Sequence, residues 1–155
     1  MRESYEESVG ELKRVDHLYY VSLKYTRTVD VIISVLGRMI NCFEHGAEAL
    51  LKYAKENKLI GDIPDNYALR CEELRKAFPE DEELQDYINF FFFLRKVVRA
   101  KYTKREEFRR HVTMTATLNN GEVVEVNIDI LKEYYDKTQD FVRYLKSKIT
   151  DISDG

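Results

Sequence analysis

The sequence is poor in the residues that interrupt or staple a chain. It has no tryptophan, two cysteines, two prolines and six glycines among 155 residues. Two isolated cysteines, Cys42 and Cys71, exclude a disulfide framework and a zinc knuckle, so we expect both to be reduced and buried. Since Pro and Gly are scarce, the internal breaks are confined to 61–64, 79–81 and 119–121, and long helices are favoured between them.

The sequence also lacks a long apolar run. The longest, Phe90–Leu94, is far shorter than the ~20 residues that cross a bilayer. The first seven residues, Met-Arg-Glu-Ser-Tyr-Glu-Glu, are acidic and contain no apolar signal-peptide core. We therefore expect a cytoplasmic protein without a membrane segment.

The composition is that of a folded domain. Hydrophobic residues make up 44% of the chain and charged residues 34%, which excludes an intrinsically disordered protein. The length suits one domain, and we predict that residues 1–155 form it. Charged residues are frequent and glutamine occurs only at Gln85 and Gln139, a usage that resembles that of heat-adapted proteins.

Apolar residues recur at helical spacing in most of the chain. They predict helices over about 3–25, 28–58, 64–78, 80–102 and 129–149. Thr26 and Thr28 are candidate caps for a second helix, although the pattern leaves open whether the first helix runs straight into it. Pro64 suits the first turn of the third helix, because its missing N–H has no helical partner there. The tail at 150–155 is predicted to be frayed.

The period changes to two between about 109 and 128. A three-residue loop at 119–121 would pair Ala116 with Val124 and Met114 with Val126, and only this register gives the hairpin one apolar face. Gly121 would then take the left-handed position. The expected fold is mainly α: a bundle of about five helices with one antiparallel β-hairpin between the last two.

Arg38 and His45 form the first candidate site. They lie seven residues apart, which is two helical turns, so both side chains point the same way. Arginine binds phosphate and histidine moves protons near neutral pH. The pair is flanked by a stripe of small and β-branched residues that would let another helix approach closely: Val31, Val35, Cys42, Gly46 and Ala49.

An Arg followed by six residues and a His resembles the Arg-x(4–6)-His signature of the HEPN superfamily. The resemblance covers about 3–102. It implies an all-helical, often dimeric bundle, and in some members an RNA-cleaving site in which the Arg and His meet their symmetry mates. Carried over, those residues are Arg38 and His45. Met39 stands where the family often has a polar residue, and the hairpin is an addition to the simple bundle.

The stretch 95–111 is the second candidate site. It holds eight cations and two carboxylates, a net charge of +6, whereas the chain as a whole carries −3 and the remainder therefore −9. Such a patch attracts phosphates, and Tyr102 or Phe108 can stack on a base. The alternative is that the cations pair with nearby carboxylates. Lys96 is one of the eight cations, and the other seven are the candidate phosphate-binding residues: Arg95, Arg99, Lys101, Lys104, Arg105, Arg109 and Arg110.

No other chemistry is indicated. His17 and His111 lack metal-ligand spacing, and the sequence has no Gly-rich phosphate loop, so we expect no metal and no cofactor. The apolar residues 90–93 and the hairpin face predict a homodimer. Three hypotheses result: a HEPN-like module that binds RNA or a nucleotide through 95–111, a non-catalytic homodimeric scaffold, and a metal-independent RNA-cleaving enzyme that uses Arg38 and His45.

Overall fold

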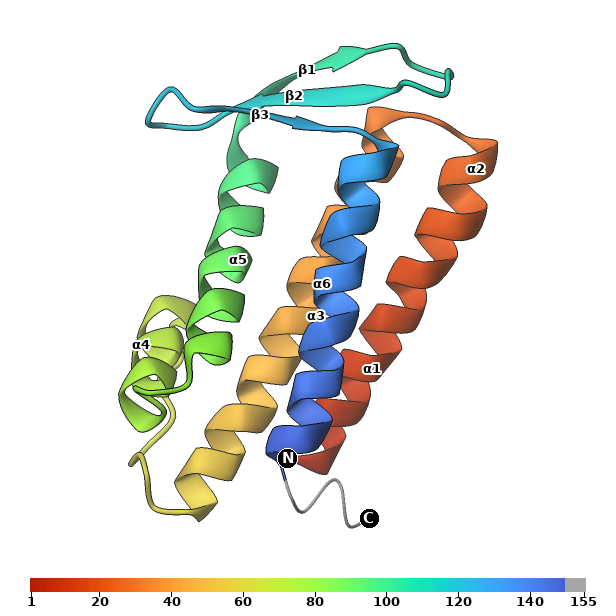
Figure 1. Cartoon of the computed structure of the whole chain (residues 1–155). Coiled ribbons are helices and arrows are strands. Elements are labelled where there is room, and N and C mark those ends of the chain that lie inside the picture. Colours follow the sequence, from red (N-terminus) through yellow and green to blue (C-terminus); the bar gives the residue numbers. More distant parts are fainter. Residues whose placement is uncertain (150–155) are drawn as a thin grey trace.

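Long helices run side by side and a small sheet lies across one end of them (Figure 1). The computed structural model describes residues 1–149, so the predicted frayed tail lies outside the described residues. Within that range the chain forms six α-helices, one π-helical segment and three strands. The mainly α fold, with its sheet between the last two helices, is confirmed.

The first helix and the second are separate. Helix α1 (Arg2–His17) continues through a π-helical segment (Leu18–Ser22) into the short α2 (Leu23–Tyr25). The chain then turns, and α3 (Val29–Glu56) begins after Thr28, whose side-chain oxygen accepts a hydrogen bond from the Val31 N–H at 3.3 Å. Thr28 is therefore the cap of α3, because it satisfies one of the backbone donors that a helix start leaves free.

Helix α3 is packed closely on both sides through its small residues. A Cβ at Gly46 would lie 2.4 Å from the Phe141 ring of α6 (Ile128–Lys148), so only glycine allows this approach. On the side of α1, the Ser8 hydroxyl donates to the Cys42 carbonyl at 2.8 Å. Burial raises the pKa of Cys42 to about 12. Cys42 and Cys71 are both buried free thiols, as predicted.

Helices α4 (Tyr67–Ala77) and α5 (Glu82–Arg99) both start at a side-chain cap. The predicted start of α4 at Pro64 is wrong, because Asn66 Oδ1 accepts from the N–H groups of Ala68 and Leu69 and fixes the first turn there. Asp81 caps α5 through the Leu84 N–H. Burial raises the pKa of Asp81, but hydrogen bonds from Tyr144, Leu84 and Lys148 outweigh it, and the net pKa is lowered.

The predicted hairpin is correct in register but belongs to a three-stranded sheet. Strands β2 (Thr113–Thr117) and β3 (Val123–Val126) pair Met114 with Val126 and Ala116 with Val124. Gly121 has a φ of 87° in the connecting loop. The sequence analysis missed β1 (Lys101–Arg105), an antiparallel edge strand on β2, and placed part of it in the preceding helix. Helix α5 ends at Arg99 instead, because the chain turns to pair with β2.

The apolar surfaces behind the homodimer prediction are covered largely within one chain. Met114, Ala116 and Val126 on the inner face of the sheet are fully buried. Phe90 and Phe91 are buried as well, whereas residues 92 and 93 are half-buried. The homodimer stays a prediction. None of the helices in the described part of the chain combines the length and apolarity that a membrane span requires.

Candidate functional site

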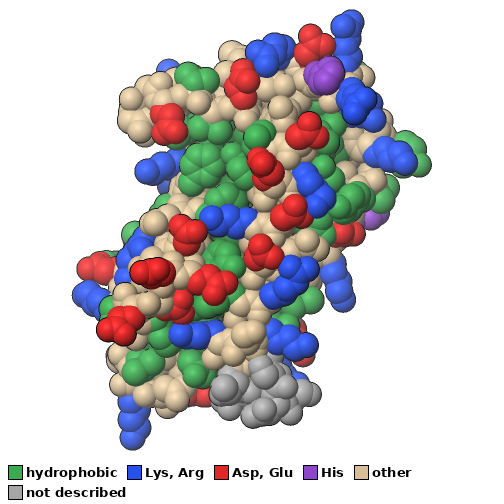
Figure 2. Space-filling view, viewed as in Figure 1, with side chains coloured by type: hydrophobic (Ala, Val, Ile, Leu, Met, Phe, Trp, Pro, Cys, Tyr) green, Lys and Arg blue, Asp and Glu red, His purple; other side chains and the backbone are tan. Residues whose placement is uncertain are grey.

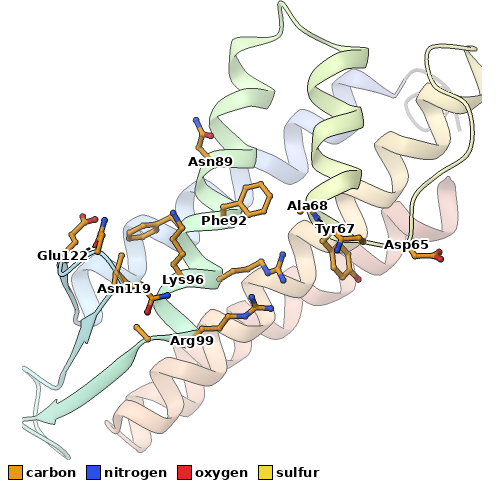
Figure 3. Close-up of a pocket in the computed structure, with 15 residues that line it drawn as sticks. Asp65, Tyr67, Ala68, Asn89, Phe92, Lys96, Arg99, Asn119 and Glu122 are labelled. Atoms are coloured by element: carbon orange, nitrogen blue, oxygen red, sulfur yellow. Dashed lines mark hydrogen bonds between the residues drawn. The ribbon is translucent and has the colours of Figure 1, made fainter.

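A groove lies between α5, the start of α4 and the β2–β3 loop (Figure 3). It encloses about 1150 Å³, enough for a ligand of nucleotide size or larger. Its floor is α5, and its two walls come from segments about thirty residues earlier and twenty residues later in the chain.

Helix α5 supplies six of the lining residues, more than either wall. Asn89, Phe92, Lys96 and Arg99 follow one another at steps of three and four residues, so they share a face. Ten residues of helix separate the first from the last, which is about 15 Å along the axis. The groove therefore offers an elongated surface with amide, aromatic and cationic groups in succession.

Three cations of the groove have no carboxylate partner among residues 1–149. Arg95 lies over the rings of Tyr67, at 5.8 Å, and Phe91, at 5.5 Å, in cation–π contacts. Lys96 and Arg99 are exposed, and among residues 1–149 neither forms an ion pair or a side-chain hydrogen bond. Their charges are available to an anion, which is the state that phosphate binding needs.

Two carboxylates also line the groove. Glu122 and Asp65 lie at its opposite ends (Figure 3). Three cations against two carboxylates leave a net charge of +1, with the positive charge in the middle. Neutral polar groups complete the lining: the amides of Asn66, Asn89, Asn119 and Asn120.

The second half of the basic stretch is ion-paired. Lys104 lies 3.2 Å from Asp30 and 3.8 Å from Glu107. Arg105 pairs with Glu125 at 3.3 Å, and Arg109 with Glu106 at 3.8 Å. Figure 2 shows Lys and Arg side chains interleaved with carboxylates at this end of the sheet. The structure thus divides the predicted site and brings only Arg95, Lys96 and Arg99 into the groove.

Lys101 and Arg110 belong to neither group. Both are exposed, and within the described residues no ion pair or side-chain hydrogen bond involves them. Lys101 begins β1, directly after the groove residue Ala100. Arg110 lies in the β1–β2 loop (106–112), at the other end of the strand.

The β1–β2 loop is held against the start of α3. The Phe108 N–H donates to the Arg27 carbonyl at 2.6 Å, and the Glu107 carboxylate accepts from the Val29 N–H at 3.0 Å. These contacts hold Phe108 at a φ of 64°, in the left-handed region that a bulky residue seldom adopts. Its side chain is 74% exposed. An exposed ring on an anchored, strained loop is a feature found at binding sites.

Arg38 and His45 lie on α3 and face α1, away from the groove. Arg38 Nη1 lies 3.4 Å from the Glu11 carboxylate, and His45 Nδ1 lies 2.9 Å from Glu7 Oε2. His45 lines a shallow depression of about 490 Å³ together with several carboxylates: Glu3, Glu6, Glu7 and Glu11. Such surroundings repel phosphate. Each of the two residues has its own structural partner, and RNA cleavage by them stays a prediction.

The sequence analysis missed the groove residues that lie outside the basic stretch. Asn66 and Tyr67 come from the start of α4, and the amides 119 and 120 from the β2–β3 loop. One signal was present: the steps of three and four from Asn89 to Arg99 place an amide, an aromatic ring and two cations on one helical face.

No metal site accompanies the groove: across residues 1–149, no three His, Cys, Asp or Glu side chains are grouped as metal ligands. Comparisons of the chain with protein-family models, with curated proteins and with solved structures gave no match. The likeness to the HEPN superfamily therefore stays a prediction.

Proposed function

We propose that this protein binds a phosphate-bearing ligand, a nucleotide or a nucleic-acid strand, in the groove along α5. The observation that carries the proposal is the set of cations Arg95, Lys96 and Arg99. They line a groove of about 1150 Å³, and in the part of the chain that the structure describes they have no carboxylate partner. A cation that is already paired with a carboxylate adds little to the free energy of phosphate binding. An unpaired cation adds more, because its contact with the phosphate releases counterions from the ligand.

The neutral lining suits the rest of a nucleotide. Phe92 points between α5 and α4 (Figure 3), and Tyr67 lies at the start of α4. Aromatic rings stack on bases, and the Asn119 amide carries both donors and an acceptor for base edges. The Asn89 amide can donate to a base, while its oxygen accepts from Arg75 at 2.7 Å. The start of α4 adds the positive end of a helix dipole. The proposed role is binding, and no catalytic step is part of it.

The test is a charge reversal at the centre of the groove. Lys96→Glu with Arg99→Glu should weaken binding of both a mononucleotide and a single-stranded RNA by about tenfold or more at low salt, measured by fluorescence anisotropy. Arg2→Glu with Lys13→Glu on α1 is the matched control, since both residues are exposed and the charge change is identical. Binding should stay within about twofold in the control.

Equal loss in the two double variants would show that overall charge, and not the groove, attracts the ligand. If the unaltered protein binds neither ligand at low salt, the proposal fails and the homodimeric scaffold remains. A cytoplasmic location is part of the same proposal, and the two buried free thiols support it.

A further inference from the structure

A second group of available contacts lies outside the groove, along β1. This strand is at the edge of the sheet, next to β2 only. It begins at Lys101 beside the groove and ends at the β1–β2 loop, which carries Phe108 and Arg110. Because β1 spans four residue steps, the two ends are about 13 Å apart.

Two aromatic residues and several cations lie along this edge and its loop. From the groove outward, the chain presents Arg99, Lys101 and Tyr102, and then, past the ion-paired Lys104 and Arg105, Phe108 and Arg110. Tyr102 is 40% exposed and Phe108 74%. Neither Lys101 nor Arg110 has a carboxylate partner among the residues that the structure describes.

A mononucleotide can occupy only the groove, whereas a nucleic-acid strand can also cover the edge formed by β1. We infer that the ligand is a single-stranded nucleic acid, which leaves the groove at Arg99, follows β1 and stacks one base on Phe108. This inference rests on the proposed function, since the groove is the starting point of the path. The shape favours a single strand: bases must be unpaired to meet a ring on an exposed loop.

The anchoring of the loop makes Phe108 a suitable platform. Its backbone is held by the hydrogen bond to Arg27, and its neighbour Glu107 is bound to the Val29 N–H. Because the backbone that carries the ring is held before binding, less conformational freedom is lost when a base stacks on it. An exposed ring on an unanchored loop would have to be ordered when the ligand binds, and this would offset part of the stacking free energy.

The experiment compares a mononucleotide with an RNA strand of about twelve nucleotides. Phe108→Ala should weaken strand binding at least about fivefold and leave mononucleotide binding unchanged, while Phe108→Tyr should restore strand affinity because the ring is kept. Tyr20→Ala is the control, since Tyr20 is an exposed aromatic residue that belongs to the π-helical segment and to neither β1 nor its loop. It should change neither affinity.

Salt dependence gives an independent readout. Arg110→Gln should lower the slope of log K against log salt by about one for the strand and by nothing for the mononucleotide. Unchanged strand affinity in Phe108→Ala, while the groove double variant still loses both ligands, overturns the inference and leaves the proposed function standing. If the unaltered protein binds neither ligand, both are overturned.

Discussion

The two halves of the basic stretch carry the same kinds of side chain but differ in what surrounds them. On α5, Lys96 and Arg99 face a groove whose carboxylates lie at its far ends. On β1 and its loop, Lys104 and Arg105 lie within 3.3 Å of Asp30 and Glu125. The fold brings these carboxylates from α3 and β3, so charge density along the sequence does not decide which cations are available.

The difference also separates two tasks. The paired half fixes the β1–β2 loop on the start of α3, where Glu107 accepts from the Val29 N–H. In the unpaired half, Arg95 packs on the rings of Tyr67 and Phe91, whereas the exposed cations Lys96 and Arg99 are left for a ligand. The predictions below alter one half at a time, from the largest expected effect to the smallest.

Glu107→Ala should destabilise the protein without affecting the groove. It removes the acceptor for a backbone donor at the start of α3, which we expect to lower the free energy of unfolding by about 1–2 kcal/mol. Urea denaturation measures this change. Glu107→Gln, which keeps an acceptor oxygen, should lose less. Mononucleotide affinity should stay within about twofold in both variants, and a parallel fall in affinity would show that the halves are not independent.

Asn119→Asp should make the groove resemble the paired half. It adds a carboxylate to the lining, and we expect about fivefold weaker mononucleotide binding at low salt, a cost of ~1 kcal/mol. The loss should shrink at high salt, because screening weakens interactions between exposed charges. Ser147→Asp on α6 adds the same charge outside the groove and is the control. Equal effects of the two changes would contradict a local role for the groove.

The helices and the hairpin were predictable because they depend on local patterns. Thr28 caps a helix through its own sequence neighbours, and Gly121 supplies the positive φ that a three-residue loop needs. Strand β1 was not predictable in the same way. Its sequence, Lys-Tyr-Thr-Lys-Arg, has no apolar alternation, and it becomes a strand because β2 offers a pairing edge.

The candidate site was predictable only in part for the same reason. The cations 95, 96 and 99 are close in sequence and were found, but Asn66 and Asn119 join them through tertiary packing. Nor did composition show that Arg105 meets Glu125, twenty residues later, across the intervening strand β2. Contacts between distant segments decided both the lining of the groove and the neutralisation of β1.

Glu125→Gln should shift the paired half toward the state of the groove. It releases Arg105, whose side chain lies on the β1 edge that we propose the nucleic acid follows. We expect the affinity for the RNA strand to rise about twofold and the slope of log K against log salt to steepen by less than one. The affinity for the mononucleotide should be unchanged. Thr117→Val, a neutral change on the neighbouring strand, serves as the control. Weaker strand binding in Glu125→Gln would place the ligand elsewhere.

Lowering the pH should destabilise the N-terminal end of α5, which lies away from the groove cations Lys96 and Arg99. Asp81 caps that end and is bound by Tyr144 at 2.7 Å and by Lys148 at 2.9 Å. Burial raises the pKa of Asp81, but these hydrogen bonds outweigh it and lower the net pKa below the ordinary value. The stabilisation is therefore complete above the pKa of the unfolded chain, about 4, and is lost as the pH falls through the lower folded pKa.

Asp81→Asn isolates that contribution. Asparagine also caps helices, so the variant keeps α5 but loses the charge that binds Lys148. Its urea midpoint should fall less steeply than that of the unaltered protein below about pH 4, while the two curves run parallel at neutral pH. Curves that stay parallel into acid would mean that Asp81 carries no linked proton. We expect this change in stability to be the smallest of the four effects, because it is confined to acid pH. The ion pair between Asp81 and Lys148 lies at the end of α5 opposite Lys96 and Arg99 and does not alter the groove.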